Sequence, residues 1–440
     1  MGMLRVVFRI CGDSGLGSRG LGNWGRALRK MLVNGVLAIA LLGGVLTSCA
    51  LPQVSAEERL FLDLSVDLVG SYVLPKQSFE GEPVGGISAI AYDVPRDRLY
   101  GLSDNRDRPR FYTFTLADTL SGLQTESAQN SPILSIESVT YLKDADGNPY
   151  ASGQLDPEGM AITPSNTLLI SSEGSPRKQI PPAVSEYDIA TGQLKQSILV
   201  PSRYLPGSDL PDSDLPDSNL INRDLSDNAL PNSVAEAEPT QTLGVQENLG
   251  FEAIAVNVSS GTGGIYEPYR MFIATEGPLL QDLDFAPDIP YKNRVLHYTL
   301  DQYQTTLISE HLYEMDLSPT GAVLHGVSEI AVLDKGGHFL AIERSYGFQG
   351  FSIKLYQLAS GGATDISTVD SMQGDISRIN PIQKELLLDL SSLDIPLQNY
   401  EAMTFGPTLG NRQRSLFLMS DDNFSSDQET SLLIFRLSNS

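Results

Sequence analysis

The chain has 440 residues, of which 41% are hydrophobic, and it carries a formal net charge of −24. This apolar content is sufficient for a sizeable core. Residues 1–48 are basic, with Asp13 as their single acid, so the remainder of the chain is even more acidic than the whole. Such a surface repels phosphate backbones, and we therefore do not expect a nucleic-acid partner.

Cysteine and histidine are scarce. The only two cysteines, Cys11 and Cys49, lie at or before the end of the leader, so residues 50–440 can form no disulfide framework, zinc–cysteine cluster or cysteine nucleophile. A Ser-His-Asp triad would need one of the four histidines beside an activated serine, and the chain contains no G-x-S-x-G motif. Serine-hydrolase chemistry is therefore not expected.

The N-terminal segment has the pattern of a bacterial export signal. A basic stretch precedes the apolar run 31–45, which is too short for a comfortable membrane span. The run ends in Leu46-Thr-Ser-Cys49, which resembles a lipobox, whose cysteine is acylated and becomes the first mature residue. We predict a signal peptide at 1–48 and a lipidated tether at 49–58. The protein would then be exported and held at the cell envelope, in the periplasm or on the outer membrane, by its lipid anchor alone.

The rest of the chain repeats one pattern five times. In each repeat, a small apolar strand with Ile-Ala or Met-Ala, or Met-Thr in the fifth, is followed by a turn and by a second strand that ends in an acid. The pairs are 88–92 with 99–104, 158–162 with 168–173, 252–256 with 271–276, 328–332 with 339–343, and 401–405 with 416–421. An Asp/Ser/Pro-rich tract at 205–245 lengthens one interval, and we predict that it is a solvated insertion. Without this tract the period is about 70 residues.

Each repeat continues with two further strand-like runs, such as 294–300 and 306–313 in the third repeat. Four antiparallel strands per repeat are typical of a β-propeller blade. The fifth repeat ends after its third strand, 432–437, and the run 68–74 is available to supply the missing outer strand. We therefore predict an all-β propeller of five or six blades over 59–440, closed by an N-terminal strand. A β-solenoid is the alternative, although its period is usually much shorter.

Acidic residues recur where the first strand of a repeat begins and where the second ends. Antiparallel pairing brings these positions to the same edge of a blade, so we expect the acids to converge near the central channel. They are Glu158, Glu252 and Glu401 at strand starts, and Asp104, Glu173, Glu276, Glu343 and Asp421 at strand ends. Converging carboxylates repel one another unless some are protonated or a cation is bound, and their oxygens suit Ca²⁺ best, or Mg²⁺. Alternatively, each acid caps its own strand end.

The loops after these acids are expected on the same face, and loops on a rigid scaffold commonly carry function. Arg106 and Arg344 follow their acids directly, and we predict that they bind an anionic group such as phosphate, together with Asn423. A local ion pair with the preceding carboxylate is the alternative for each arginine.

Ten short motifs carry a resemblance to a known family. They are Gly85-Gly-Ile-Ser-Ala-Ile-Ala-Tyr92, Ser103-Asp-Asn-Arg106, Asp156-Pro-Glu-Gly159, Ser172-Glu-Gly174, Gly250-Phe-Glu-Ala253, Thr275-Glu-Gly-Pro278, Ser328-Glu329, Ile342-Glu-Arg344, Asn399-Tyr-Glu-Ala402 and Ser420-Asp-Asp-Asn423. Together they resemble the phytase-like domain family, also called "esterase-like activity of phytase" proteins, from about residue 68 to the C-terminus. The resemblance implies a β-propeller and hydrolysis of esters or phosphoesters. By analogy with calcium-dependent propeller phytases, it also implies an acidic face that binds Ca²⁺ and phosphate.

These observations lead to three hypotheses of function. The first is a monomeric, metal-dependent hydrolase of small anionic phosphate esters. Its predicted catalytic residues are Glu173, Glu276, Glu343 and Asp421, and its predicted metal ligands are Asp104, Glu158, Glu252 and Glu401. The second is a calcium-dependent lactonase or carboxylesterase, for which Asn105 and Asn423 become candidate ligands. The third is a non-catalytic binding or scaffolding propeller at the cell envelope.

Overall fold

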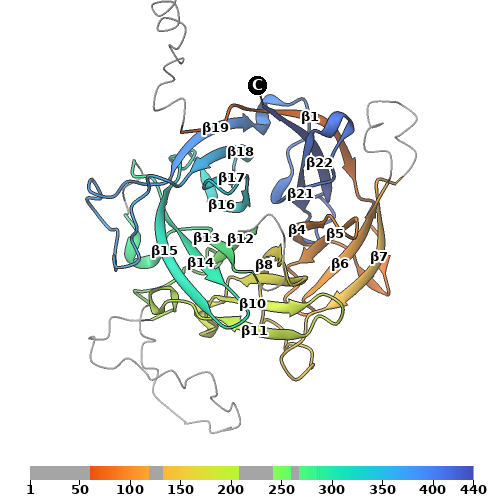
Figure 1. Ribbon diagram of the computed structural model, residues 1–440, viewed down its shortest axis with the longest axis horizontal. Helices are drawn as coiled ribbons and strands as arrows, with labels where there is room; N and C mark the ends of the chain where they lie inside the picture. The colour runs from red at the N-terminus through yellow and green to blue at the C-terminus, as the bar shows by residue number, and fades with distance from the viewer. Residues whose placement is uncertain are drawn as a thin grey trace, which may run out of the picture. The chain divides into compact units, whose positions relative to one another are not determined.

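Five four-stranded antiparallel sheets are arranged as blades around a central channel (Figure 1). The computed structural model describes residues 60–117, 132–207, 241–258, 267–284, 286 and 288–439. The predicted all-β propeller is confirmed, and the described residues form five blades. The predicted signal peptide, Cys49, the tether at 49–58 and most of the 205–245 insertion lie outside these residues.

The strands of each blade follow one another from the channel outwards. Blade 1 consists of β4 (Ile87–Asp93), β5 (Arg98–Ser103), β6 (Arg110–Leu116) and β7 (Leu134–Tyr141). Blade 2 consists of β8 (Pro157–Ile162), β9 (Thr167–Ser172), β10 (Ala183–Asp188) and β11 (Leu194–Ile198). Blade 3 consists of β12 (Phe251–Val258), β13 (Tyr269–Thr275), β14 (Lys292–Leu300) and β15 (Thr305–Glu314). Blade 4 consists of β16 (Ala322–Val332), β17 (His338–Gly347), β18 (Gly350–Ala359) and β19 (Gln383–Asp389).

Blade 5 joins the two ends of the propeller. It consists of β20 (Asn399–Phe405), β21 (Arg414–Asp421), β22 (Ser431–Asn439) and, as its outer strand, β1 (Leu64–Val73). β1 pairs antiparallel with β22, from Leu64 opposite Asn439 to Val73 opposite Ser431. The prediction that an N-terminal strand closes the ring is therefore confirmed.

Position in the blade explains the composition of each strand. The second strands are sandwiched between neighbouring blades, and β9 is buried along its whole length, which fits its apolar sequence Thr-Leu-Leu-Ile-Ser-Ser. The outer strands face solvent on one side, and β11 accordingly carries exposed Lys195, Gln196 and Ser197 between less exposed ends. This gradient from apolar inside to mixed outside is the expected pattern for strands that radiate from a channel.

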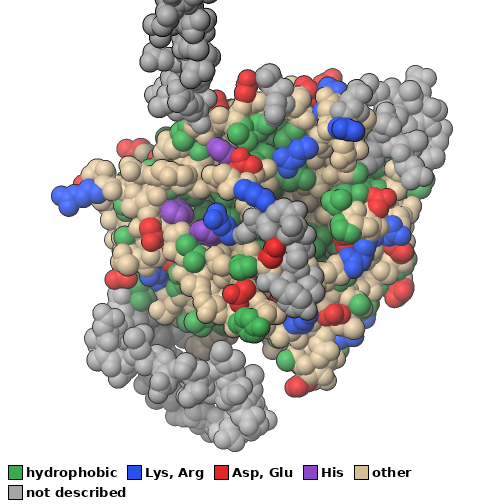
Figure 2. Space-filling view, in the orientation of Figure 1, with side chains coloured by type: hydrophobic (Ala, Val, Ile, Leu, Met, Phe, Trp, Pro, Cys, Tyr) green, Lys and Arg blue, Asp and Glu red, His purple; other side chains and the backbone are tan. Residues whose placement is uncertain are grey.

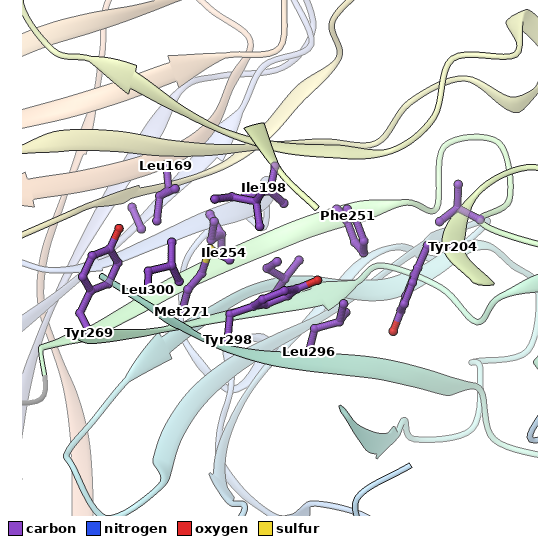
Figure 3. Packing of buried hydrophobic residues seen from close by; sticks show 14 of the residues in the cluster. Leu169, Ile198, Tyr204, Phe251, Ile254, Tyr269, Met271, Leu296, Tyr298 and Leu300 are labelled. Carbon is purple, nitrogen blue, oxygen red and sulfur yellow. The ribbon is translucent and has the colours of Figure 1, made fainter. Parts of the chain in front are cut away.

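Apolar side chains fill every interface between neighbouring blades. Between blades 2 and 3, Leu169 and Ile198 meet Phe251, Met271 and Leu296 (Figure 3). Clusters of the same kind occupy the other four interfaces. Burial of apolar surface stabilises by about 25 cal/mol per Å². Because the ring is closed, every blade is held on both faces, and the strand ends at the channel have fixed positions.

Short elements complete the described structure. They are a small hairpin of β2 (Ser78–Phe79) and β3 (Glu82–Pro83), and the 3-10 turns η4 (Pro176–Lys178), η5 (Ser202–Tyr204), η7 (Leu280–Asp282), η8 (Leu390–Ser392) and η9 (Gly410–Arg412). Within the described ranges, no helix is long and apolar enough to cross a membrane. On the face shown in Figure 2, basic side chains are scattered among acidic ones rather than gathered in one patch.

Candidate metal centre at the channel mouth

Every inner strand contains a β-bulge, close to the strand start in blades 1, 2, 3 and 5 and after Val327 within β16 in blade 4. In β12 the register shifts between Phe251 and Ala253, which leaves Glu252 as the extra residue. The corresponding residues of the other blades are Ser88, Glu158, Ser328 and Glu401. A bulge turns the extra side chain out of the regular alternation of the strand. These five residues are the first residues of the five sequence repeats, which we call the lead positions. The same bulge therefore presents a glutamate in blades 2, 3 and 5.

The second strand of each blade ends beside this bulge. The amide of Glu173 donates to the carbonyl of Asp156 at 3.1 Å, and the amide of Glu276 donates to the carbonyl of Gly250 at 2.9 Å. The same bond joins Asp104 to Gly86 in blade 1, at 2.9 Å. In blade 5 the equivalent strand-end acid, Asp421, pairs with Asn399. The strand-end acids of four blades thus occupy equivalent places around one mouth of the channel.

Blade 4 departs from this pattern, and the prediction for Glu343 is corrected. Its register places Arg344, opposite Gly326, at the position that an acid occupies in the other blades. Glu343 lies one residue earlier, and because side chains alternate between the faces of a strand, it points elsewhere. Its carboxylate accepts from the Tyr313 hydroxyl at 2.8 Å and pairs with Lys384. It is an interblade contact and is not part of the channel group.

The remaining acids approach one another closely. Two sets of carboxylates each have oxygens within 4.8 Å of one another, namely Asp156, Glu158 and Glu173, and Glu173, Glu252 and Glu276. Glycines permit this approach, since a Cβ at Gly250 would overlap the backbone of Glu173 and a Cβ at Gly326 would overlap the side chain of Glu276. Glu173, shared by both sets, connects the acids of blades 2 and 3.

Burial and mutual repulsion raise the pKa values of this group. Burial raises the pKa of Asp104 to about 7, and the charges of Glu401 and Asp156 add to the effect. The pKa values of four further carboxyls lie well above their ordinary range, first because of burial and then because of neighbouring acids: Glu158, Glu173, Glu252 and Asp421. The group therefore cannot carry its full negative charge unless protons or a cation compensate it.

Arg344 compensates part of this charge from within. Its buried guanidinium donates to Glu276 at 2.6 Å, to Asn399 at 2.8 Å and to Glu401. This pairing links blades 3 and 5 through blade 4. The partners of Arg344 are thus Glu276 and Glu401, and not the preceding Glu343 of the alternative prediction. Arg344 is thus a resident counter-ion of the carboxylates rather than an open phosphate contact.

The other predicted contact residues lie at the rim. Arg106 is partly exposed and donates to Asp156 at 2.6 Å and to Asn248 at 3.3 Å. Asn423 is exposed, and its side-chain amide donates to Gln428 at 2.9 Å. Asn105 is engaged in its own loop, where its side-chain oxygen accepts two backbone amides. Of these residues, Arg106 contacts the carboxylate group through its side chain, and Asn423 contacts Asp421 through its backbone amide at 2.9 Å.

Two acids of the mouth, Asp156 and Asp422, were not predicted as site residues, although both lie in motifs that carry the family resemblance. Asp156 occupies the position that glycine holds in blades 1, 3 and 4, two residues before the lead position. Asp422 accepts the amide of Gly86 at 2.9 Å and pairs with Lys76 at 3.0 Å. If the compared repeats had started two residues earlier, Asp156 would have been recognised as an acid at an otherwise small or polar position. Nothing in the repeat pattern distinguishes Asp422.

The family described as phytase-like, esterase-like activity of phytase, matches residues 82–424. The chain belongs to this phytase-like family. The matched span begins before blade 1 and ends in the loop after β21, so it includes every carboxylate of the channel mouth. A search of curated proteins gave no match.

Solved propellers resemble this phytase-like chain at low identity. An endo-arabinase from Bacteroides thetaiotaomicron has a TM-score of 0.39 and 10% identity, over 80% of this chain and 93% of that one. The catalytic domain of a Coprinopsis cinerea GH62 alpha-L-arabinofuranosidase has a TM-score of 0.38 and 11% identity, over 86% and 98%. The Dos1 propeller has a TM-score of 0.30 and 8% identity, over 80% and 68%. Likenesses this distant carry no functional argument.

The donor set of the phytase-like propeller fits a divalent cation. Ca²⁺ binds oxygens at about 2.3–2.6 Å, so ligands on opposite sides of one ion lie about 5 Å apart. The oxygens of Asp156, Glu158 and Glu173 lie within 4.8 Å of one another, which is compatible with a shared ion. In addition, Asp104 Oδ1 and Asp156 Oδ2 are buried and accept no hydrogen bond within the described residues. Buried polar atoms normally have a partner, and a cation would supply one.

Proposed function

We propose that this protein is a phytase-like hydrolase of phosphate esters that works with Ca²⁺ held at the channel mouth. The observation that carries the proposal is the set of converging carboxylates with two unpartnered buried oxygens, on Asp104 and Asp156. Membership of a family described by esterase-like activity supports a hydrolase. Few basic residues surround the mouth, so the substrate class we favour is a small ester with one phosphate.

The charges around the ring suggest where the ion would bind. Arg344 pairs with Glu276 and Glu401, and Arg106 pairs with Asp156. Next to Asp156, the carboxylates of Asp104, Glu158 and Glu173 form no ion pair with a basic side chain of the described residues, and burial raises the pKa of each. We assign the ion to these four residues. When bound, it would supply a positive charge that holds the ester oxygens and makes a water more acidic.

The chain's own residues have defined parts in this scheme. Glu276 and Asp421, both predicted as catalytic, face the same group and are the candidate bases that take the proton from water. Glu252 and Glu401, predicted as metal ligands, surround the site as further negative charges, and Glu401 is partnered by Arg344. Arg106 at the rim is placed to orient an anionic substrate, provided that it exchanges its contact with Asp156.

A second candidate function is hydrolysis of a neutral ester or lactone. It is favoured by the ion pairing of both arginines, because Arg106 already binds Asp156 and Arg344 already binds Glu276 and Glu401. An anion would have to use their remaining nitrogens, such as the buried Arg344 Nε, which has no partner among the described residues. A neutral carbonyl substrate would need no such contact.

Phosphate release from a panel of phosphomonoesters, with Ca²⁺ titration and a chelator control, tests the leading proposal. We expect calcium-dependent release that Asp156→Asn and Asp421→Asn abolish, with the fold intact by circular dichroism. Release that is independent of calcium, or unchanged in both variants, would remove the channel mouth from the reaction. If only carboxyl esters or lactones are cleaved, the second candidate is correct. If no ester is cleaved, a binding or scaffolding propeller remains.

We also propose that the protein is exported and tethered through Cys49. The supporting feature is the order of a basic stretch, an apolar run and Leu46-Thr-Ser-Cys49. Metabolic labelling with a radioactive fatty acid in a bacterial host tests this proposal. Label is expected in the full chain and should be absent in Cys49→Ser, and equal labelling of both would contradict it.

A further inference from the structure

An aromatic side chain lies directly against the candidate metal centre. Phe424 packs on Gly86, and a Cβ at Gly86 would overlap both the Phe424 ring and the Asp104 carboxylate. The ring therefore borders a carboxylate that we assign to the metal. Phe424 is 37% exposed, and the guanidinium of Arg110 lies 5.8 Å from the centre of its ring, so part of the ring surface is open to solvent. An exposed aromatic ring beside a charged, buried site is a surface that a bound molecule can cover.

The backbone holds Phe424 in this place in spite of local strain. Both Asn423 and Phe424 have positive φ angles, of 47° and 52°. This region is unfavourable for a bulky aromatic residue, and such strain is found where the surrounding structure imposes it. Here Asp421 Oδ1 accepts the amide of Asn423 at 2.9 Å, and Asp422 Oδ1 accepts the amide of Phe424 at 3.1 Å. The acids of the mouth thus fix the aromatic ring beside it.

Blade 4 supplies a second apolar surface on the same face. Leu324, Tyr346 and Phe351 stand opposite one another on β16, β17 and β18, and the rings of Tyr346 and Phe351 are 4.7 Å apart. Tyr346 follows Arg344 by two residues, so both side chains are on one face of β17, about 6.6 Å apart along the strand. Leu324 and Tyr346 are each 41% exposed. Leu324, Tyr346 and Phe351 therefore form an apolar row at the rim, next to the carboxylates.

We propose that these two surfaces bind an apolar group of the substrate, so that the site selects esters with an aryl or comparable apolar group. This inference rests on the proposed function and narrows its substrate class. Phe424 and the row Leu324–Tyr346–Phe351 act as specificity-determining residues, whereas the carboxylates bind the polar end. A polyphosphorylated substrate is disfavoured, since the mouth offers apolar surface and Arg106 and Arg344 are already paired with acids. Arg110, beside the Phe424 ring, already donates to the backbone carbonyls of Arg108 and Pro83.

Binding of two non-hydrolysable phosphonates tests the inference separately from catalysis. Phenylphosphonate and methylphosphonate carry the same head group and differ in the ring. In the presence of Ca²⁺, isothermal titration calorimetry of the full chain is expected to give at least tenfold tighter binding of phenylphosphonate, equivalent to about 1.4 kcal/mol. Phe424→Asn keeps a residue that tolerates positive φ and removes the ring. Tyr346→Thr keeps a good strand former. Each is expected to reduce the ratio at least threefold.

Tyr303→Thr is the matched control, because Tyr303 is 87% exposed in the turn between β14 and β15, at the opposite end of the blade from the mouth. It should leave the ratio unchanged. Equal affinity of the two phosphonates, failure of both to bind, or a preference for the ring that survives Phe424→Asn and Tyr346→Thr would each overturn the inference. Cleavage of phenyl phosphate is measured in parallel. Tight phenylphosphonate binding without cleavage would refute the proposed catalysis and leave the apolar subsite standing.

Discussion

Calcium should remove a pH-dependent instability that the channel carboxylates impose on the fold. The pKa of Asp104 rises from 3.8 to about 7 on folding. A carboxyl with a raised pKa contributes its full stability below pH 3.8, and that stability is lost as the pH rises through 7. At about 1.4 kcal/mol per pKa unit, Asp104 alone lowers the free energy of unfolding by about 4 kcal/mol between pH 4 and 8. The raised pKa values of Glu158 and Glu173 act in the same direction.

Urea denaturation followed by circular dichroism at pH 5, 6, 7 and 8 measures this effect. With a chelator, the free energy of unfolding should fall as the pH rises. Ca²⁺ at 1,000 times its dissociation constant should restore about 4 kcal/mol at pH 8 and much less at pH 5, where protons compete with it. Asp104→Asn should make the curve in the chelator less steep, with the remaining slope due to Glu158 and Glu173, whereas Asp63→Asn, at an exposed position, should leave the slope unchanged. A curve that is flat in the chelator for the unmodified chain would refute the reasoning.

Three further changes test other parts of the structure. Arg344→Gln leaves Glu276 and Glu401 without their buried partner and should cost about 3–5 kcal/mol of unfolding free energy in urea denaturation, whereas a cost below about 1 kcal/mol would show that Arg344 is no counter-ion. Gly86→Ala should destabilise more than Gly81→Ala in the same assay, because both have positive φ but only the Gly86 position is crowded; equal losses would contradict this. Burial lowers the pKa of His297 to about 4, so stability falls as the pH drops from 6.5 to 4, and His297→Phe should reduce that fall, measured in Ca²⁺. An unchanged slope would exclude His297 as its source.

The fold was accessible from the sequence because propeller blades repeat. Each repeat must bury a sheet on both faces, so apolar runs recur at equivalent places in the blades, as in β9 (Thr167–Ser172) and β13 (Tyr269–Thr275). The incomplete fifth repeat and the unpaired run near residue 70 together predicted the closure through β1. The sequence left the number of blades at five or six. The structure has five interfaces between neighbouring blades, each filled by one apolar cluster, and therefore five blades.

The site was harder to predict from the sequence than the fold, because a shift of one residue in strand register moves a side chain to the other face of the sheet. The motif Ile342-Glu-Arg344 contains an acid at nearly the expected place, and sequence similarity alone aligned Glu343 with Glu276 and Asp421. Only the pairing of Val327 with Glu343 shows that Arg344 is the equivalent residue. The partners of Arg106 and Arg344 were equally out of reach, since Asp156 and Glu276 come from other blades.

The substitution at this one position changes the chemistry of the whole ring. Five equivalent blades with an acid at each strand end would distribute negative charge evenly around the channel, with no preferred place for an ion. Arg344 adds a fixed guanidinium between Glu276 and Glu401, so the charge near blade 4 is balanced within the protein. Glu252 and Asp421 also form no ion pair with a basic side chain of the described residues, but the buried carboxylate oxygens of the mouth without hydrogen-bond partners, Asp104 Oδ1 and Asp156 Oδ2, are both found in blades 1 and 2. The arginine at this one position thus breaks the near-symmetry of the ring, and this asymmetry supports the proposed cation site on the side of blades 1 and 2, bordered by Phe424.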